Sequence, residues 1–324
     1  MILEFMLILN QREIWSALSF EEALSAMEEA FLLFEAGDFH MPDRMHAHHG
    51  DNTLLLMPCF TNQYFGTKLV SVNPENPKRN LPAIYGSMIL NDTTSGEALS
   101  LMNGAALTAF RTGAVGGIGI KYTTPVNANS VGIIGTGVQG FTQALFACKV
   151  RPIKELYVFD TQQKKANEFI AKLKMELPHL KLQSCSSNIE LVNKSQIIIT
   201  TTTSKKAVVP DDAELIKGKH FIGIGSYKPD MHEFPAQLYP LLDKLYVDTP
   251  FAKEETGDVA TALKNGLISD SQVTPISKLI ASKKTIAETT SLFKSVGMAL
   301  FDLVMAQKIY ARAMESKIGS EIEI

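Results

Sequence analysis

The feature that most constrains the fold is a glycine-rich turn between an apolar run and a segment with helical periodicity. Residues 131–134 (Val-Gly-Ile-Ile) are followed by Gly135, Gly137 and Gly140 in the spacing Gly-x-Gly-x-x-Gly. The first glycine permits a tight turn, the second lets a pyrophosphate approach the backbone, and the third lets strand and helix pack closely. With a helix predicted over residues 138–150, the pattern indicates a dinucleotide-binding unit of the Rossmann type.

An acidic residue stands where such a unit needs one. Asp160 ends the next predicted strand, residues 156–159, about 20 residues beyond Gly140. A carboxylate at this position accepts hydrogen bonds from the adenosine ribose hydroxyls and repels a 2′-phosphate. We therefore predict NAD(H) as the preferred cofactor, while Lys164 and Lys165 leave NADP(H) open.

Strands and helices alternate after a polar, proline-containing linker at residues 123–130. The further predicted elements are a helix at residues 162–177 and strands at residues 197–200, 221–225 and 245–248. Such alternation favours a parallel sheet with right-handed crossovers. Polar residues 200–204 would then lie at the carboxyl edge of this sheet, where ligands bind.

The first hundred residues have a different pattern of apolar and polar residues. The apolar run at residues 1–9 predicts a buried strand, since it is too short to span a bilayer and lacks the parts of a signal peptide. Ser19-Phe-Glu-Glu22 predicts a capped helix that ends at Gly37. Short apolar and alternating runs between residues 41 and 101 predict a mostly antiparallel sheet.

Two helices complete the predicted architecture. Residues 104–122 are rich in Ala and Gly, which permits close approach of another backbone, and residues 289 to about 316 carry an apolar face. We expect the second helix to pack back on the first domain. A chain of 324 residues favours two domains. We predict the α/β fold class, with a Rossmann domain at 124–297 and a discontinuous α+β domain at 1–123 and 298–324.

Composition excludes several classes of function. The chain has 31 basic and 34 acidic residues, and its formal net charge of -3 disfavours nucleic acid and acidic membranes as partners. Its three cysteines are widely spaced, which indicates neither disulfides nor a zinc site, so we expect a cytoplasmic protein. The four histidines within residues 40–49 have no nearby carboxylate or cysteine to complete a site, and we predict no metal.

Motifs spread over the chain carry a family resemblance. They are Met41-Pro-Asp-Arg44, Gly66-Thr-Lys-Leu-Val70, Asn73-Pro-Glu-Asn-Pro77, Leu107-Thr-Ala-Phe-Arg-Thr-Gly-Ala114 and Phe293-Lys-Ser-Val-Gly297. In combination they resemble the ornithine cyclodeaminase and μ-crystallin family over essentially the whole chain. That family pairs a Rossmann domain with a sheet domain that also dimerises, and its members handle α-amino or α-imino acids at a nicotinamide. The resemblance implies a homodimer whose discontinuous domain binds the substrate.

The resemblance also implies roles for three cations. Arg44 and Arg111 would clamp the substrate carboxylate, a task that suits the guanidinium fork. Lys68 would lie beside the reacting nitrogen and exchange a proton with it, because burial near arginines lowers the pKa of a lysine. The predicted cofactor-binding residues are Arg111, Thr112, Gly135, Thr136, Gly137, Val138, Gln139, Gly140, Asp160, Thr161, Thr200, Thr201, Thr202 and Ser226.

One segment separates the activities of the family. True cyclodeaminases have a Gly-Asp-Cys-Pro-Gly-Lys type segment, whose aspartate acts on water or the amine. Aligning residues 223–233 on Pro229 places Tyr227, a predicted substrate-binding residue, at that position. Asp230, three residues later, is a candidate catalytic residue if the loop bends differently.

The segment Ser-Tyr-Lys-Pro-Asp-Met looks like that of the family's ketimine reductases. The predicted function is therefore NAD(P)H-dependent reduction of a cyclic α-imino acid, Δ1-pyrroline-2-carboxylate or Δ1-piperideine-2-carboxylate, to proline or pipecolate. An ornithine cyclodeaminase is the first alternative, and a dinucleotide-dependent binding protein of μ-crystallin type is the second. An opine-forming or alanine-type dehydrogenase is a lesser one.

Overall fold

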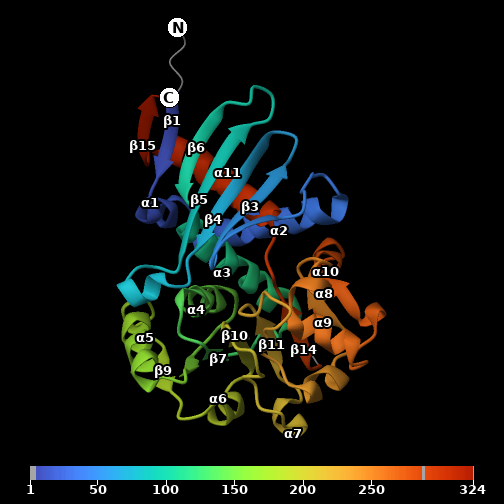
Figure 1. Cartoon of the computed structure of the whole chain (residues 1–324). Helices are drawn as coiled ribbons and strands as arrows, with labels where there is room; N and C mark the ends of the chain where they lie inside the picture. Colours follow the sequence, from blue (N-terminus) through green and yellow to red (C-terminus); the bar gives the residue numbers. More distant parts are fainter. Residues whose placement is uncertain (1–4, 287–288, 324) are drawn as a thin grey trace. The chain divides into compact units, whose positions relative to one another are not determined.

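The structure, a computed structural model, describes residues 5–286 and 289–323, and it divides into two compact units (Figure 1). Unit 1 takes its described residues from Met1–Arg111 and Met298–Ile324, and unit 2 is Thr112–Gly297. The units divide inside helix α3 (Gly104–Thr123), whereas the predicted boundary lay at the end of that helix.

Unit 1 contains, within its described part, a seven-stranded sheet in the order β15-β1-β6-β5-β4-β3-β2. β1 and β6 are parallel and the other neighbours are antiparallel, which confirms the mostly antiparallel prediction. The strands are β1 (Phe5–Leu9), β2 (Met45–His49), β3 (Asn52–Phe60), β4 (Tyr64–Val72), β5 (Ile84–Asp92), β6 (Ala98–Asn103) and β15 (Ser320–Glu323). The prediction for residues 1–4 lies outside the described residues.

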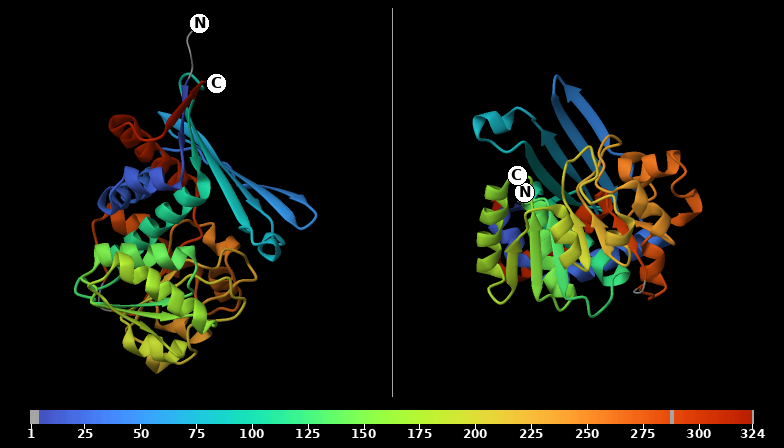
Figure 2. Two further views of the ribbon diagram at one scale, coloured as in Figure 1. Left: turned by 90° about the vertical axis from the view of Figure 1, so that its left-hand side faces the viewer. Right: turned by 90° about the horizontal axis from the view of Figure 1, so that it is seen from below.

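Helices gather on one side of this sheet, as the left-hand view of Figure 2 shows. α11 (Ala299–Ser316) packs on β3, β4 and β5 and against α2 (Phe20–Ala36). Ser19 and Glu22 form the predicted capping box of α2, and Gly37 ends the helix with φ 75°. The remaining helices of unit 1 are α1 (Gln11–Ala17), the 3-10 turn η1 (Asn76–Arg79) and the first part of α3.

Unit 2 contains, in its described residues, eight parallel strands in the order β13-β12-β14-β11-β10-β7-β8-β9. The chain order runs outward in one direction from β7 to β9 and in the other from β10 to β11, so the sheet has a switch point between β7 and β10. Beyond β11 the strand order is β14, β12 and β13. This is the predicted Rossmann topology. The strands are β7 (Ser130–Ile134), β8 (Glu155–Phe159), β9 (Lys181–Ser184), β10 (Ile197–Thr200), β11 (His220–Gly223), β12 (Leu245–Val247), β13 (Val273–Pro275) and β14 (Ser291–Lys294).

The helices of unit 2 connect these strands. They are α4 (Val138–Val150), α5 (Gln163–Glu176), α6 (Asn188–Lys194), α7 (Ala213–Ile216), η2 (Ala236–Leu241), α8 (Ala252–Glu255), α9 (Gly257–Lys264), η3 (Asp270–Gln272) and α10 (Ser277–Ala281). The second part of α3 makes the close contacts that its glycines predict. A Cβ on Gly113 would lie 2.5 Å from the Phe146 ring, and one on Gly119 would lie 2.2 Å from the Phe293 ring.

The structure corrects one prediction. Residues 291–294 form strand β14 between β11 and β12, and α11 begins only at Ala299, so the helix predicted from residue 289 was wrong over its first ten residues. Leu292 and Val296 fit a helical spacing. However, the periodicity of a short apolar run that is buried on both faces does not distinguish a strand from a helix. Gly297, at φ 77°, turns the chain into α11.

Candidate functional site

A buried carboxylate in unit 1 holds two of the predicted cations. The Lys68 ammonium, from the middle of β4, donates to Asp302 Oδ2 at 2.6 Å. Arg111 Nε, from α3, donates to Asp302 Oδ1 at 2.9 Å. Asp302 lies on the sheet-facing side of α11, and all three residues are buried, with exposed fractions of 1 to 5%. The two cations therefore sit at opposite oxygens of one carboxylate.

The surroundings of Lys68 are apolar apart from these charges. Its cross-strand neighbours on the same face of the sheet are Met57 and Met88, both buried. Burial lowers the pKa of Lys68 to about 8, with Asp302 opposing this shift and Arg111 and Arg44 adding to it. The field of Arg44 at Lys68 means that all three predicted cations act on one place in unit 1.

Asp302 stays ionised in this environment. Burial alone would raise the pKa of its carboxyl, but the charges and hydrogen bonds of Arg111 and Lys68 hold it below its usual value. The cluster thus has a fixed anion, a guanidinium and an ammonium whose proton is exchangeable near neutral pH.

The glycine turn of unit 2 fits a dinucleotide. Gly135 has φ 102°, and a Cβ on Gly140 would lie 2.3 Å from the Gly135 carbonyl oxygen, so both positions require glycine. A Cβ on Gly137 would meet nothing within 4 Å, so the chain leaves the space above this residue open. Gly137 is the N-cap of α4, whose first N–H groups suit a pyrophosphate.

Asp160 is tied to the same turn. Its Oδ2 accepts hydrogen bonds from Thr136 N at 3.2 Å and Thr136 Oγ1 at 2.6 Å, and its Oδ1 accepts one from Gln162 N at 2.9 Å. Burial would raise the pKa of Asp160, but these hydrogen bonds and the charge of Lys165 lower it. The carboxylate therefore remains charged, with lone pairs left for a ribose hydroxyl.

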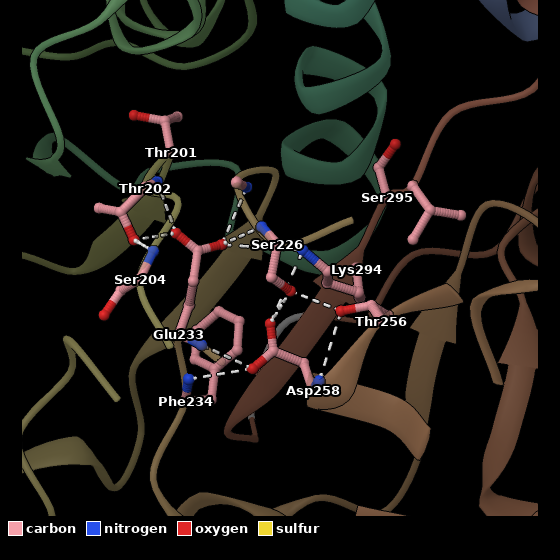
Figure 3. A network of polar contacts seen from close by, with 12 residues as sticks. Thr201, Thr202, Ser204, Ser226, Glu233, Phe234, Thr256, Asp258, Lys294 and Ser295 are labelled. Carbon is pink, nitrogen blue, oxygen red and sulfur yellow. Dashed lines mark hydrogen bonds and ion pairs between the residues drawn. The ribbon is translucent and has the colours of Figure 1, made fainter. Parts of the chain in front are cut away.

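The predicted residues after β10 and β11 meet at the carboxyl edge of the sheet (Figure 3). Thr200 is buried at the end of β10, and Thr201 Oγ1 donates to the Gly135 carbonyl at 2.9 Å, which joins this edge to the glycine turn. Thr202 and Ser226 both donate to the buried carboxylate of Glu233.

Other predicted residues vary in burial. Thr112 is buried and its carbonyl accepts a hydrogen bond from Gln143 Nε2 at 2.7 Å, Gln139 is half-buried, and Val138 and Thr161 are exposed.

Tyr227 and Asp230 lie in an exposed part of the loop that follows β11. Tyr227 is 41% exposed, and the Lys228 ammonium lies 5.7 Å from the centroid of its ring. Asp230 forms an exposed ion pair with Lys205 at 2.6 Å, which lowers the pKa of Asp230. The carboxylate is thus ionised and already paired within unit 2.

The buried charged residues that the sequence prediction did not name include Asp302, Glu233, Asp258 and Lys294. Asp302 and Lys294 each interrupt an apolar stretch, Ala299-Leu-Phe-Asp-Leu-Val304 and Ser291-Leu-Phe-Lys294. Since a buried charge is costly without a partner, a lone charge in such a run is the signal that could have identified them.

The predictions that the chain binds no metal and no membrane stay predictions. Among residues 5–286 and 289–323, no group of three or more His, Cys, Asp or Glu side chains is placed to hold a metal ion. Nor does this part of the chain contain a helix that combines the length and apolarity needed to cross a bilayer.

Comparison with known proteins gives consistent matches over nearly the whole chain. The model of the "Ornithine cyclodeaminase/mu-crystallin family" matches residues 5–317. A Δ1-pyrroline-2-carboxylate reductase of Bacillus thuringiensis subsp. konkukian is 34% identical over 281 residues, which cover 84% of this chain and 85% of the relative.

Two solved structures are similar in fold and sequence. The Thermococcus litoralis Δ1-pyrroline-2-carboxylate reductase, in complex with NADH and L-proline, has a TM-score of 0.91 and 30% identity, covering 98% of this chain and 100% of that one. An archaeal alanine dehydrogenase dimer with bound NAD has a TM-score of 0.90 and 31% identity, covering 99% of each chain. With the family model and these relatives in agreement, the chain belongs to the ornithine cyclodeaminase/mu-crystallin family.

Proposed function

We propose that this chain is an NAD(P)H-dependent ketimine reductase that converts a cyclic α-imino acid, Δ1-pyrroline-2-carboxylate or Δ1-piperideine-2-carboxylate, to proline or pipecolate. Its relatives are named as reductases and dehydrogenases, and the chain is an oxidoreductase of this family. The observation that carries the substrate class is the buried cluster of Lys68 and Arg111 on Asp302, under the field of Arg44.

The cluster supplies what imine reduction needs from a protein. Arg44 and Arg111 bind the α-carboxylate and fix the orientation of the ring. The Lys68 ammonium donates a proton to the imine nitrogen, which makes the adjacent carbon electrophilic, and water later restores that proton. Asp302 holds the ammonium in place by its hydrogen bond of 2.6 Å.

Unit 2 supplies the residues that would hold the cofactor. The turn at Gly135, Gly137 and Gly140 would take the pyrophosphate, and Asp160 the adenosine ribose. When bound, the reduced nicotinamide supplies the hydride for the imine carbon. We propose NAD(H) as the preferred form because Asp160 is charged, and the NADH complex of the Thermococcus litoralis relative agrees with this preference.

The geometry favours reduction over cyclodeamination. Cyclodeamination removes a hydride, releases ammonia and returns the hydride, so it needs an additional acid or base. The sequence alignment on Pro229 assigns Tyr227 to the position of that group, and Asp230 is paired on the surface with Lys205. An alanine dehydrogenase remains the second candidate, because an acyclic imino acid presents the same carboxylate and nitrogen and one solved relative has that name.

The three cysteines are free thiols, which suits a reducing compartment, and we propose that the enzyme acts in the cytoplasm.

A set of substrate mixtures distinguishes these functions. NADH should be consumed with Δ1-pyrroline-2-carboxylate or Δ1-piperideine-2-carboxylate, and proline or pipecolate should accumulate, as followed by absorbance and chromatography. The Lys68→Met variant, which lacks the proton donor, should lose about a thousandfold in kcat/KM, while its affinity for NADH should stay within a few fold of the wild type. Proline and ammonia from ornithine and NAD, or faster turnover with pyruvate, ammonia and NADH, would contradict the proposal.

The pH profile tests the proton donor. Because protonated Lys68 is the active form, kcat/KM for imine reduction should fall as pH rises through about 8. Asp302 raises the pKa of Lys68, so Asp302→Asn should move this fall to lower pH by about one unit, at unchanged NADH affinity. An unchanged profile in a folded Asp302→Asn variant would mean that another group supplies the proton.

Cofactor choice should depend on Asp160. Asp160→Ala removes the charge that repels a 2′-phosphate, and we expect the preference for NADH over NADPH to fall by about tenfold. Fluorescence titration with each nucleotide measures the effect. Lys172→Ala, which lies further along α5 and is exposed, is the control and should change the preference little. Equal discrimination in the two variants would remove Asp160 from this role.

We further propose that the chain is a homodimer through the face of the unit 1 sheet opposite α11. Lys68 points toward α11. Because side chains alternate along a strand, Leu54, Phe60 and Tyr85 lie on the other face of the sheet. Met45 lies on that face too, because it pairs with Leu56. These four side chains are 37 to 62% exposed in the single chain. An exposed apolar face of this kind fits a second copy, and the archaeal relative is a dimer.

Light scattering after size-exclusion chromatography tests the dimer. Leu54→Asp would place a charge in the centre of the proposed interface, and the mass should fall from dimer to monomer. Met175→Asp, on α5 and 76% exposed, is the control and should keep the mass of the wild type. A wild-type monomer, or a dimer that tolerates Leu54→Asp, would rule out this face.

A further inference from the structure

Besides Arg151 and Asp248, unit 2 buries three charged side chains that lie close to one another. Figure 3 shows Glu233, Asp258 and Lys294 within one network of polar contacts. Each has an exposed fraction of 0%. They come from the loop after β11, the first turn of α9 and the end of β14. Transferring one charge into a protein interior costs several kcal/mol, so three of them together need partners.

Backbone and hydroxyl groups solvate the two carboxylates. Glu233 Oε1 accepts hydrogen bonds from Thr202 N at 2.7 Å and from Thr202 Oγ1 at 2.9 Å. Its Oε2 accepts hydrogen bonds from Gly225 N at 2.8 Å and from Ser226 N at 3.0 Å. Asp258 Oδ1 accepts from Glu233 N at 2.8 Å and Phe234 N at 3.2 Å, and its Oδ2 accepts from Ser226 Oγ at 2.5 Å. The segments of Thr202, Gly225–Ser226 and Glu233–Phe234 are thereby tied to a carboxylate.

Lys294 contributes charge rather than hydrogen bonds. Its Nζ lies 3.7 Å from both Glu233 Oε2 and Asp258 Oδ2, and it has no hydrogen-bond partner within the described residues. Burial raises the pKa of Glu233 and the charge of Asp258 adds to this, while Lys294 opposes the shift. The other titratable groups nearby include Asp248, which follows β12 and is buried. Its Oδ2 accepts from Ser295 Oγ at 2.7 Å. They also include His232, which precedes Glu233, and Tyr239 on η2, whose hydroxyl donates to the Asp258 carbonyl at 2.6 Å.

The segments held by this network follow β10 and β11. These strands belong to the half of the sheet across the switch point from β8, the strand that ends at Asp160. In this fold the two halves each receive one mononucleotide, so the loops of Thr202 and Gly225 belong to the nicotinamide half. The loops are in close contact, because a Cβ on Gly225 would lie 2.2 Å from Thr202 N and 2.5 Å from Glu233 Oε1.

We propose that Glu233, Asp258 and Lys294 form a positioning unit, in which the charge of Lys294 offsets part of the repulsion between the two carboxylates, so that they hold the Thr202 and Gly225–Ser226 backbone in the shape that receives the nicotinamide half of the dinucleotide. The inference rests on the dinucleotide part of the proposed function. None of the three is a catalytic residue, since they act through the loops that they hold.

Removing the cation should make nicotinamide binding depend on pH. In Lys294→Met the two carboxylates face each other without a cation, so one of them takes a proton at low pH and loses it as pH rises. The loops should then separate by charge repulsion. We expect the Kd for NADH, measured by fluorescence between about pH 6 and about pH 9, to rise about tenfold in the variant and to stay nearly flat in the wild type.

Matched variants separate charge balance from a general loss of structure. Lys294→Met combined with Asp258→Asn leaves one carboxylate with its donors and should return most of the NADH affinity at high pH. Glu233→Gln keeps an acceptor for Thr202 but turns an amide N–H toward Gly225 and Ser226, so it should weaken NADH binding equally at all pH values. A merely structural role would not give these two different pH signatures.

ADP-ribose, which lacks the nicotinamide, provides the internal control. Its Kd should stay within about twofold of the wild type in Lys294→Met, because the glycine turn and Asp160 are untouched. Melting of the ligand-free Lys294→Met variant should also occur at lower temperature as pH rises, since stability that depends on a bound proton is lost above the raised pKa.

Two results would overturn the positioning role: NADH affinity in Lys294→Met that follows the wild type at both ends of the pH range, or equal weakening of NADH and ADP-ribose. If Lys294→Met does not fold, a Glu233→Gln variant that binds NADH like the wild type has the same meaning. A wild-type protein that binds neither nucleotide would instead reject the dinucleotide proposal itself.

Discussion

The Asp302 carboxylate is the constraint on which the candidate site of unit 1 depends. Without a buried anion, an ammonium and a guanidinium could not lie so close together inside an apolar sheet, because each would face a desolvation cost and the charge of the other. Asp302 offsets both through hydrogen bonds of 2.6 and 2.9 Å. It leaves Lys68 ionised at neutral pH but with a pKa of about 8, a value suited to proton transfer.

Unit 2 also buries like charges close together, but here the like charges are two carboxylates rather than two cations. Two buried carboxylates gather N–H and hydroxyl donors from loops that would otherwise have no reason to approach, and Lys294 balances part of their charge. In unit 1 the charged groups lie on β4, α3 and α11, whereas in unit 2 Glu233 lies in a loop and is held between Asp258 on α9 and Lys294 on β14. Buried charges of this kind are costly in stability and are well suited to fixing one geometry.

Local patterns predicted much of the fold. The glycine turn, the capping box at Ser19 and the alternation after residue 131 each depend on neighbours within a few turns of chain, and the structure bears them out. The prediction failed at residues 289–298, where a strand in the middle of a sheet is decided by its two neighbours rather than by its own periodicity. The predicted roles of Arg44, Lys68 and Arg111 stay predictions, although their charges act on one place.

The sequence alone determined that the chain contains a Rossmann unit, which family it resembles and which cations are candidates, because those signals are written in short, contiguous motifs. Only the tertiary structure decided what holds the cations and what holds the loops that follow β10 and β11. Lys68 and Asp302 are 234 residues apart, and Glu233 and Asp258 are joined to Lys294 across three separate elements. Partners at such separation leave no pattern in a single sequence, since the folding of the whole chain brings them together.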